Sequence, residues 1–171
     1  MSHKEYVLSL IEQYNQKNLA YGNNAHKTFC RFGKAAYAMR LMDKFQRLEN
    51  LISNSSINCA DESIEDTLGD AITYILMFAA DLSCELISGK SDINDECNIE
   101  KTLEMLQLFV CTPEEGISEM ADAFEESYVK NTQKLDLVIY TMYLDPETTP
   151  TDYVLFAAYL IDFYMKGMKN T

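Results

Sequence analysis

The residues of this sequence best suited to chemistry are the acids of the segment 61–70, Asp-Glu-Ser-Ile-Glu-Asp-Thr-Leu-Gly-Asp. Glu62, Asp66 and Asp70 are four residues apart, so a helix places them on one face. Neighbouring carboxylates repel one another, and a hard divalent cation would remove that cost. Mg²⁺ takes oxygen ligands and is often completed by substrate phosphates, so the segment indicates a metal–phosphate site. An ordinary solvated acidic face fits the same spacing.

A second group of charged residues lies upstream, in a predicted helix over residues 25–51, and combines one acid with three cations. Its members follow helical spacing: Arg40, Asp43, Lys44 and Arg47. In this interpretation Asp43 supplies one more metal carboxylate and the cations hold phosphate oxygens. An apolar stripe from Phe29 to Met39 leads into Asp43 on the same side of the helix, which predicts that the group faces the core. The alternative is a set of ion pairs within one helix.

Length and composition predict an all-α helical bundle that positions these groups. The chain has 171 residues, of which 47% are hydrophobic, so it can bury a core. Glycine (6) and proline (3) are scarce, which favours long helices over a turn-rich β fold. The helix over 61–86 can be buried on two sides, and we expect it at the centre of the bundle. The other expected helices begin after a Ser2–Glu5 capping box and run to a turn at 21–24, then over 25–51, 99–111, 113–144 with a break near Asn131, and 150–168.

The residue pattern divides the chain into three parts. Residues 1–87 are predicted to form a helical core with the charged groups, 88–98 a linker, and 99–171 a C-terminal helical extension that packs on the core or completes it. The aromatic residues at helical spacing between Tyr153 and Tyr164 are interpreted as core.

Charge, hydropathy and cysteine usage exclude several classes of protein. The net charge of −13 argues against direct nucleic-acid binding, because phosphate contacts need a basic surface. The longest apolar run, Ala71–Leu82, is shorter than the roughly 20 residues that cross a membrane, so no membrane partner is expected. The five cysteines include no Cys-x-x-Cys pair and no signal peptide is recognised, so we expect reduced, mostly buried thiols in a cytoplasmic protein.

A longer pattern joins these pieces over about residues 13–82. Its motifs, in order, are Lys17-Asn18, Tyr21-Gly22, Phe32-Gly33, Arg40-Leu41-Met42-Asp43-Lys44-Phe45-Gln46-Arg47-Leu48, Asp61-Glu62-Ser63, Asp66-Thr67-Leu68-Gly69-Asp70 and Tyr74. In this combination the sequence resembles the nucleotide modification associated domain 1 family, which is widespread in bacteriophages and bacteria. That family is related to the MazG-like all-α nucleoside triphosphate pyrophosphatases.

The resemblance implies a Mg²⁺-dependent pyrophosphohydrolase, with Mn²⁺ as the alternative ion, that converts an NTP or dNTP to the monophosphate and pyrophosphate. It also implies a homodimer or higher homo-oligomer in the cytoplasm of a bacterial or phage-infected cell. The expected catalytic residues are Glu62 and Asp66. The expected metal ligands are Asp43, Glu62, Asp66 and Asp70. The expected nucleotide-binding residues are Arg40, Lys44, Arg47, Asn50 and Tyr74.

Two other functions stay open at this point. MazG proteins carry Glu-x-x-Glu on the second helix, whereas this chain has Arg40 and Asp43 there, so the pocket could hold a nucleotide or a signalling nucleotide without hydrolysing it. The net charge alone motivates the other alternative, an acidic interaction protein that imitates nucleic acid toward a basic partner.

Overall fold

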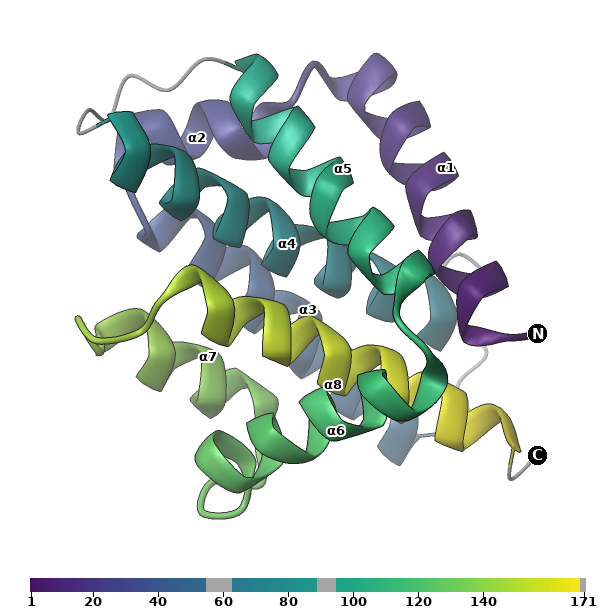
Figure 1. Ribbon diagram of the computed structural model, residues 1–171. Coiled ribbons are helices and arrows are strands. Elements are labelled where there is room, and N and C mark those ends of the chain that lie inside the picture. Colours follow the sequence, from purple (N-terminus) through teal and green to yellow (C-terminus); the bar gives the residue numbers. More distant parts are fainter. Residues whose placement is uncertain (55–62, 89–94, 170–171) are drawn as a thin grey trace.

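The computed structural model describes residues 1–54, 63–88 and 95–169, and every regular element within these ranges is helical (Figure 1). The helices are α1 (His3–Tyr21), α2 (Asn24–Phe32), α3 (Ala35–Ser53), α4 (Ile64–Ser88), α5 (Asp95–Cys111), α6 (Glu114–Phe124), the short π-helix η1 (Glu125–Val129), α7 (Leu135–Leu144) and α8 (Pro150–Lys169). The predicted all-α fold is confirmed.

Helix α4 lies at the centre of the bundle and packs against α3, α5 and α8 (Figure 1). Its residues Leu68, Ile72 and Ile75 are fully buried, which confirms the prediction of a central helix. Among the described residues, Ile64–Glu85 is also the one segment long and apolar enough to span a membrane. Because 78% of its apolar window is buried inside the fold, it has the surroundings of a core helix.

Helix α8 packs against both α4 and α6, and aromatic rings fill the space around it. Phe156 stacks on Phe45 of α3, with ring centroids 5.3 Å apart, and on Phe124 of α6, with centroids 4.5 Å apart. Tyr153 and Phe156 are buried as interpreted, whereas Phe163 is largely exposed. The last part of the chain therefore shares one core with α3 and α4.

The two ends of α1 form as the residue pattern predicts. The Ser2 amide donates to the Glu5 carboxylate at 2.7 Å, and the Glu5 amide donates to the Ser2 hydroxyl at 3.2 Å, which completes the capping box. At the other end Gly22 takes a left-handed conformation with φ of 58°, and Asn23 follows with φ of 56°. Asn23 is buried at this turn, and its side chain donates to Asn98 of α5 at 3.2 Å.

The prediction of one continuous helix over 25–51 is wrong, because the chain breaks at Gly33. This residue has φ of 67° and ψ of −156°, and α2 ends before it while α3 begins after it. The break ends the apolar stripe: Phe32 and Met39 are about 70% exposed, at 71% and 68%. Asp43 and Arg47 are exposed as well, so the prediction that the charged group faces the core is wrong for these two residues.

Replacing Gly33 by alanine should lower the free energy of unfolding by about 1–3 kcal/mol, because its backbone angles are strained for any residue with a Cβ. Nothing lies within 4 Å of the added methyl group, so the loss would report backbone strain alone. Gly167→Ala is the matched control: it is helical, equally open, and should gain about 0.5 kcal/mol. Urea unfolding followed by circular dichroism measures both, and equal effects of the two substitutions would contradict the strain at Gly33.

A disulfide joins Cys84 of α4 to Cys97 of α5, with their Cα atoms 6.5 Å apart. The expectation of reduced thiols is therefore wrong for this pair. The spacing of 13 residues gives no local motif, and the bond forms because α5 runs back along α4 (Figure 1). Cys30 and Cys111 remain thiols, half-buried and exposed respectively, and Cys59 lies outside the described residues.

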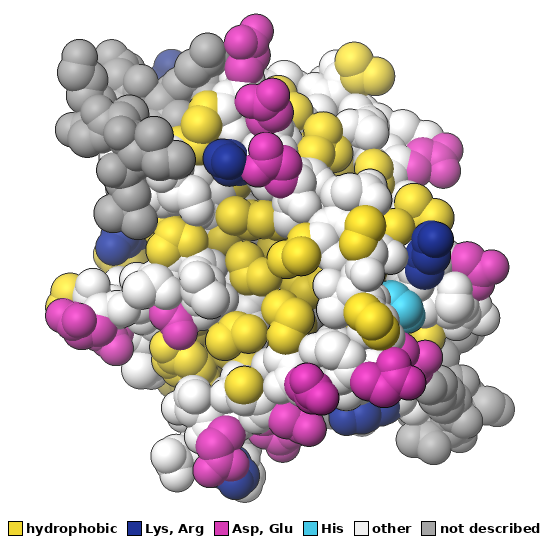
Figure 2. All heavy atoms as spheres, in the orientation of Figure 1, with side chains coloured by type: hydrophobic (Ala, Val, Ile, Leu, Met, Phe, Trp, Pro, Cys, Tyr) yellow, Lys and Arg dark blue, Asp and Glu magenta, His cyan; other side chains and the backbone are white. Residues whose placement is uncertain are grey.

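The acidic side chains on the face drawn in Figure 2 lie mainly around its periphery, and the centre of that face is apolar. On this face the acidic side chains are therefore spread out and not gathered into one patch. An acidic interaction surface would need such a patch to imitate a row of phosphates.

Candidate functional site

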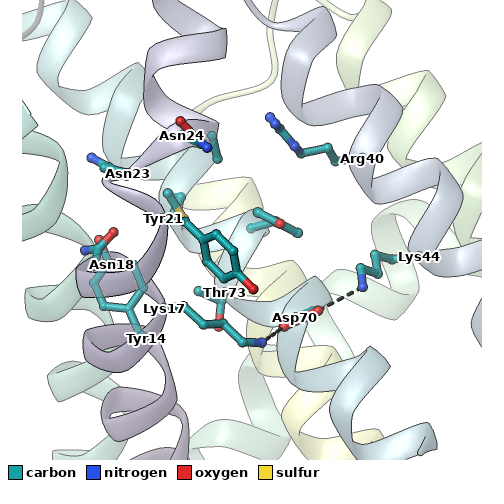
Figure 3. Close-up of a pocket in the computed structure, with 13 residues that line it drawn as sticks. Tyr14, Lys17, Asn18, Tyr21, Asn23, Asn24, Arg40, Lys44, Asp70 and Thr73 are labelled. Atoms are coloured by element: carbon teal, nitrogen blue, oxygen red, sulfur yellow. Dashed lines mark hydrogen bonds and ion pairs between the residues drawn. The ribbon is translucent and has the colours of Figure 1, made fainter. Parts of the chain in front are cut away.

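A cavity of about 520 Å³ opens between α1, α2, α3 and α4 (Figure 3). Its wall contains basic, amide and aromatic side chains from all four helices and the turn between the first two. The lining residues are Tyr14, Lys17, Asn18, Tyr21, Asn23, Asn24, Ala25, Arg40, Lys44, Asp70, Thr73, Tyr74 and Met77. Figure 3 shows the α1 side chains facing Arg40 and Lys44 of α3 across the cavity. The volume falls within the range of about 300–1,000 Å³ typical of small-molecule sites.

Three cations and one carboxylate line this cavity, in a chain whose net charge is −13. Asp70 accepts hydrogen bonds from Lys17 and from Lys44, whose Nζ lies 2.8 Å from Asp70 Oδ2. Burial acts to raise the pKa of Asp70, but the hydrogen bonds from the two lysines outweigh it and hold that pKa below its usual value. Asp70 is therefore a carboxylate that compensates part of the positive charge, and the cavity keeps an excess of cations.

Arg40 and Asn23 line the cavity, and each has a buried polar atom without a hydrogen-bond partner among the described residues. The Arg40 guanidinium lies over the Tyr74 ring at 5.9 Å and donates from Nη2 to Thr28 Oγ1 at 3.4 Å, yet its buried Nη1 has no hydrogen-bond partner within the described part of the chain. Asn23 donates to Asn98 at 3.2 Å, but its buried Oδ1 likewise has no partner among the described residues. Buried polar atoms nearly always have partners. These two orphaned atoms set this wall of the cavity apart from an ordinary packed core.

Four of the predicted site residues line this cavity, and the other predicted residues that the structure describes lie elsewhere. The four that do are Arg40, Lys44, Asp70 and Tyr74. Asp43, Arg47 and Asn50 are exposed residues of α3 outside the lining. Asp66 is exposed at the start of α4, where its carboxylate accepts from the Ser63 hydroxyl at 2.9 Å and its amide donates back at 3.0 Å.

The four acids predicted to hold Mg²⁺ or Mn²⁺ are not brought together as far as the structure describes them. In the ranges 1–54, 63–88 and 95–169, no three His, Cys, Asp or Glu side chains lie close enough to hold a metal ion. Asp66 forms a helix cap, and Asp70 is engaged by two lysines. Glu62, the remaining ligand and expected catalytic residue, lies outside the described residues. The described acids therefore do not fit the metal site that the sequence predicts.

The residues that form the α1 side of the cavity are not among those predicted from the sequence. Tyr14, Lys17, Asn18 and Tyr21 contribute it from one face of the helix. Lys17, Asn18 and Tyr21 belong to the family pattern, and the spacing of three and four residues places all of them on one side. That spacing was the available signal, but an exposed amphipathic helix shows the same one.

Fold and cavity together define an all-α protein with a cation-rich pocket between its first four helices. Comparisons with protein-family models, curated proteins and solved structures gave no match. The resemblance to the nucleotide modification associated domain 1 family therefore rests on the sequence pattern, and membership of that family stays a prediction.

Proposed function

We propose that the protein binds a nucleotide in the cavity between α1 and α4. The observation that carries this proposal is the convergence of Lys17, Arg40 and Lys44 on one small cavity of a strongly acidic protein. Collecting cations there opposes the overall charge and offers a local site for an anion. Arginine and lysine side chains are the usual protein donors to phosphate oxygens.

The phosphate groups of the nucleotide would lie at the α3 side of the cavity. Arg40 and Lys44 are one turn apart on α3 and point into the cavity in Figure 3, so one pair of adjacent phosphates can reach both. The Arg40 guanidinium keeps a fixed positive charge at this side of the cavity, which a phosphate group would neutralise. Lys44 and Lys17 share Asp70, and an arriving phosphate would compete with that carboxylate for their protons.

The base and sugar would lie against the α1 side. The Tyr21 ring projects into the cavity in Figure 3 and is 66% exposed, so one ring face is available for stacking on a base. Asn18 and Asn24 add amide groups that both donate and accept, as the edge of a base requires. Recognition by amides and an aromatic ring fits a nucleotide better than it fits inorganic phosphate.

The proposal is limited to binding. Hydrolysis through a bound metal would need carboxylates that converge on the phosphate end, and Asp70 is the one acid among the described lining residues. Mg²⁺-dependent pyrophosphohydrolase activity therefore stays the wider prediction from the sequence, with Glu62 as its remaining untested residue.

A nucleotide panel measured by isothermal titration calorimetry, with and without Mg²⁺, tests the proposal. We expect binding of one or more nucleoside di- or triphosphates, weaker binding of the corresponding nucleosides, and affinity that persists when EDTA removes metal ions, because the cations belong to the protein. Chromatography of the same samples separates bound ligand from product. Failure of all phosphorylated compounds to bind, with a folded protein in the cell, would refute the proposal; pyrophosphate release only with Mg²⁺ would extend it to hydrolysis.

A further inference from the structure

A second polar cluster lies in the core, between α2, α3 and α4, and contains the one internal histidine. His26 Nδ1 lies 2.6 Å from Asp81 Oδ1, and the Tyr37 hydroxyl donates to Asp81 Oδ2 at 2.6 Å. His26 is 2% exposed, and Asp81 and Tyr37 are fully buried. Burial and the adjacent Asp81 carboxylate raise the pKa of Tyr37 well above its usual value, so its hydroxyl keeps its proton and serves as a donor.

The contact with Asp81 orients the two nitrogens of the His26 ring. A carboxylate at Nδ1 requires the proton on that nitrogen, so Nε2 of the neutral ring is an acceptor. Nε2 lies 3.5 Å from the Cys30 sulfur, one turn further along α2, and 3.5 Å from Asp95 Oδ1 of α5. Thiol, imidazole and carboxylate thus follow one another in the order of an activated nucleophile, its base and the group that orients the base.

We propose that Cys30 is a nucleophilic thiol that exchanges with small anionic disulfides. His26 activates the thiol, and Asp81 orients the His26 ring. This site is separate from the proposed nucleotide pocket and does not depend on it. The cluster has more parts than a core histidine needs, because a buried imidazole is satisfied by one carboxylate and one further partner.

A cavity of about 310 Å³ gives access to the sulfur. It is lined by His26, Lys27, Cys30, Arg31 and Asp95. Lys27 and Arg31 are exposed and flank Cys30 on α2, so they favour a negatively charged thiolate and a negatively charged reactant. The ligand class is therefore an anionic low-molecular-weight disulfide.

The exchange needs only Cys30, His26 and the reactant disulfide, which together account for every proton and electron pair that moves. The thiol of Cys30 transfers its proton to Nε2 of His26, and Asp81 and Asp95 stabilise the resulting imidazolium. The thiolate attacks one sulfur of the reactant disulfide, a new S–S bond forms, and the old S–S bond breaks. The leaving thiolate carries away the electron pair and can take the proton from His26. No external oxidant is consumed, since the reactant disulfide is itself reduced.

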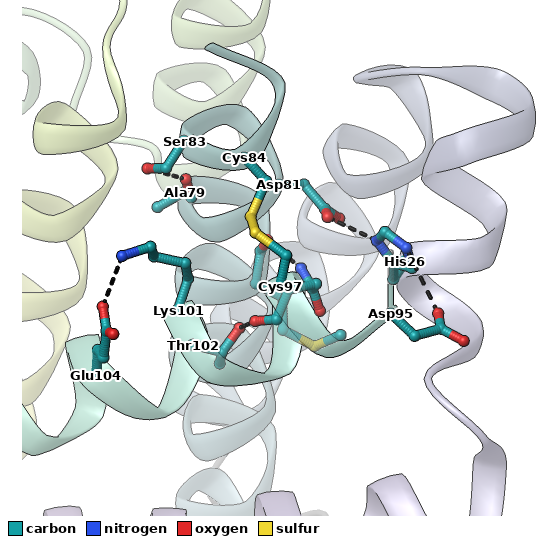
Figure 4. Close-up of a disulfide and its surroundings, with 12 residues drawn as sticks. His26, Ala79, Asp81, Ser83, Cys84, Asp95, Cys97, Lys101, Thr102 and Glu104 are labelled. Atoms are coloured by element: carbon teal, nitrogen blue, oxygen red, sulfur yellow. Dashed lines mark hydrogen bonds and ion pairs between the residues drawn. A yellow bond between two sulfur atoms is a disulfide. The ribbon is translucent and has the colours of Figure 1, made fainter. Parts of the chain in front are cut away.

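The Cys84–Cys97 disulfide holds the two helices that supply the carboxylates. Asp81 lies one turn before Cys84 on α4, and Asp95 lies two residues before Cys97 on α5. Figure 4 shows His26 between Asp81 and Asp95, beside this disulfide. The covalent link between α4 and α5 thus keeps a carboxylate on each side of the imidazole.

Alkylation of the intact protein by iodoacetamide tests the activation, with Cys111 as the internal control. Cys111 is exposed and lies outside the cluster, so it serves as the reference thiol in the same protein. Although less accessible, Cys30 should react at least about 10-fold faster than Cys111 at about pH 6, and the difference should shrink toward about pH 9. Peptide mapping by mass spectrometry gives both rates from one sample. Equal rates at the lower pH, or a difference that survives in guanidinium, would overturn the proposal.

Two variants separate the base from the fold. His26→Gln should abolish the advantage of Cys30 over Cys111 at about pH 6. Because His26 is buried, Asp95→Asn is the second variant: its side chain is 48% exposed, and it should slow Cys30 by about 3-fold without unfolding the protein. An Asp95→Asn protein and a folded His26→Gln protein that both alkylate like the wild type would overturn the role of His26.

Reactant charge tests the ligand class. Oxidised glutathione is anionic and cystamine is cationic, and both undergo the same exchange. Cys30 should favour glutathione over cystamine by at least about 5-fold relative to Cys111, and Lys27→Gln with Arg31→Gln should remove that preference. Faster reaction with cystamine would overturn the assignment of an anionic reactant.

Discussion

Replacing Arg40 and Lys44 together by methionine should weaken the binding of dATP and of pyrophosphate at least about 100-fold. Hydrogen bonds to charged groups contribute about 1.5–3 kcal/mol each, and every 1.4 kcal/mol is about tenfold in affinity. Methionine keeps most of the apolar stem of both side chains, so the loss reports the charges. Asp70 keeps its ion pair with Lys17 in this variant, which limits the damage to the cavity wall.

The matched control is the pair Lys101→Met and Lys130→Met. Lys101 is partly exposed and Lys130 is exposed, each is ion-paired with a glutamate of its own helical segment, and neither lines the cavity. Each double variant loses two positive charges, so both change the net charge from −13 to −15. Calorimetric titrations should show wild-type affinity for the control. Similar weakening in both proteins would mean that net charge, and not the cavity, controls the affinity. Binding within about 3-fold of wild type in the Arg40/Lys44 variant would exclude this cavity as the nucleotide site.

The helical framework could be predicted because its signals are local. The Ser2–Glu5 capping box, the apolar face of α4 and the start of α8 at Pro150 each depend on a few neighbouring residues, and each forms as expected. The break within residues 113–144 also forms, since α7 begins at Leu135 after a residue, Gln133, with positive φ. Periodicity and capping need no knowledge of what a helix packs against.

The candidate site could be predicted only in part, because helix rotation decides which residues face a cavity. The apolar stripe placed Asp43 on the buried side, but Phe32, Met39 and Asp43 are all exposed. Arg40, Lys44 and Tyr74 reach the pocket all the same. Asp66 shows the second difficulty: an acid three residues after Ser63 is equally suited to cap a helix and to bind a metal, and here it caps α4.

The buried cluster around His26 had one visible signal in the sequence. Asp81 interrupts the apolar run of α4, and an acid in a core helix needs a buried donor. His26 and Tyr37 are 55 and 44 residues away, so only the packing of α2 and α3 on α4 identifies them as the donors. Long-range polar pairs of this kind have no spacing rule that a single sequence reveals.

Helix α4 connects the two proposed sites. It contributes Asp70 and Thr73 to the nucleotide pocket, and Asp81 to the cluster beside Cys30 about three turns later. Between them, the backbone carbonyl of Met77 accepts from Asn98, which also binds Asn23 of the pocket. The rigidity of both sites therefore depends on the same buried helix.

Replacing Asp81 by alanine should destabilise the protein by about 3–5 kcal/mol, the largest effect we expect from a single substitution. The change removes the acceptor of two buried donors, the His26 ring and the Tyr37 hydroxyl, and both donors lose that hydrogen bond. Asp43→Ala is the control, because that exposed acid should change stability by less than about 0.5 kcal/mol. Urea unfolding measures the stability of both variants, and non-reducing conditions keep the Cys84–Cys97 disulfide intact.

A double-mutant cycle with Tyr37→Phe shows whether Asp81→Ala destabilises the protein by removing hydrogen bonds or by leaving a cavity. In the wild-type background Tyr37→Phe removes a donor from the buried Asp81 carboxylate and should cost about 1–3 kcal/mol. In the Asp81→Ala background the hydroxyl has already lost its acceptor, so the same change should cost little or even stabilise the protein. Additive effects of the two substitutions would mean that cavity formation, and not the hydrogen bond between Tyr37 and Asp81, explains the destabilisation. A strong coupling would show that the carboxylate next to His26 is held by the network that also orients the imidazole toward Cys30.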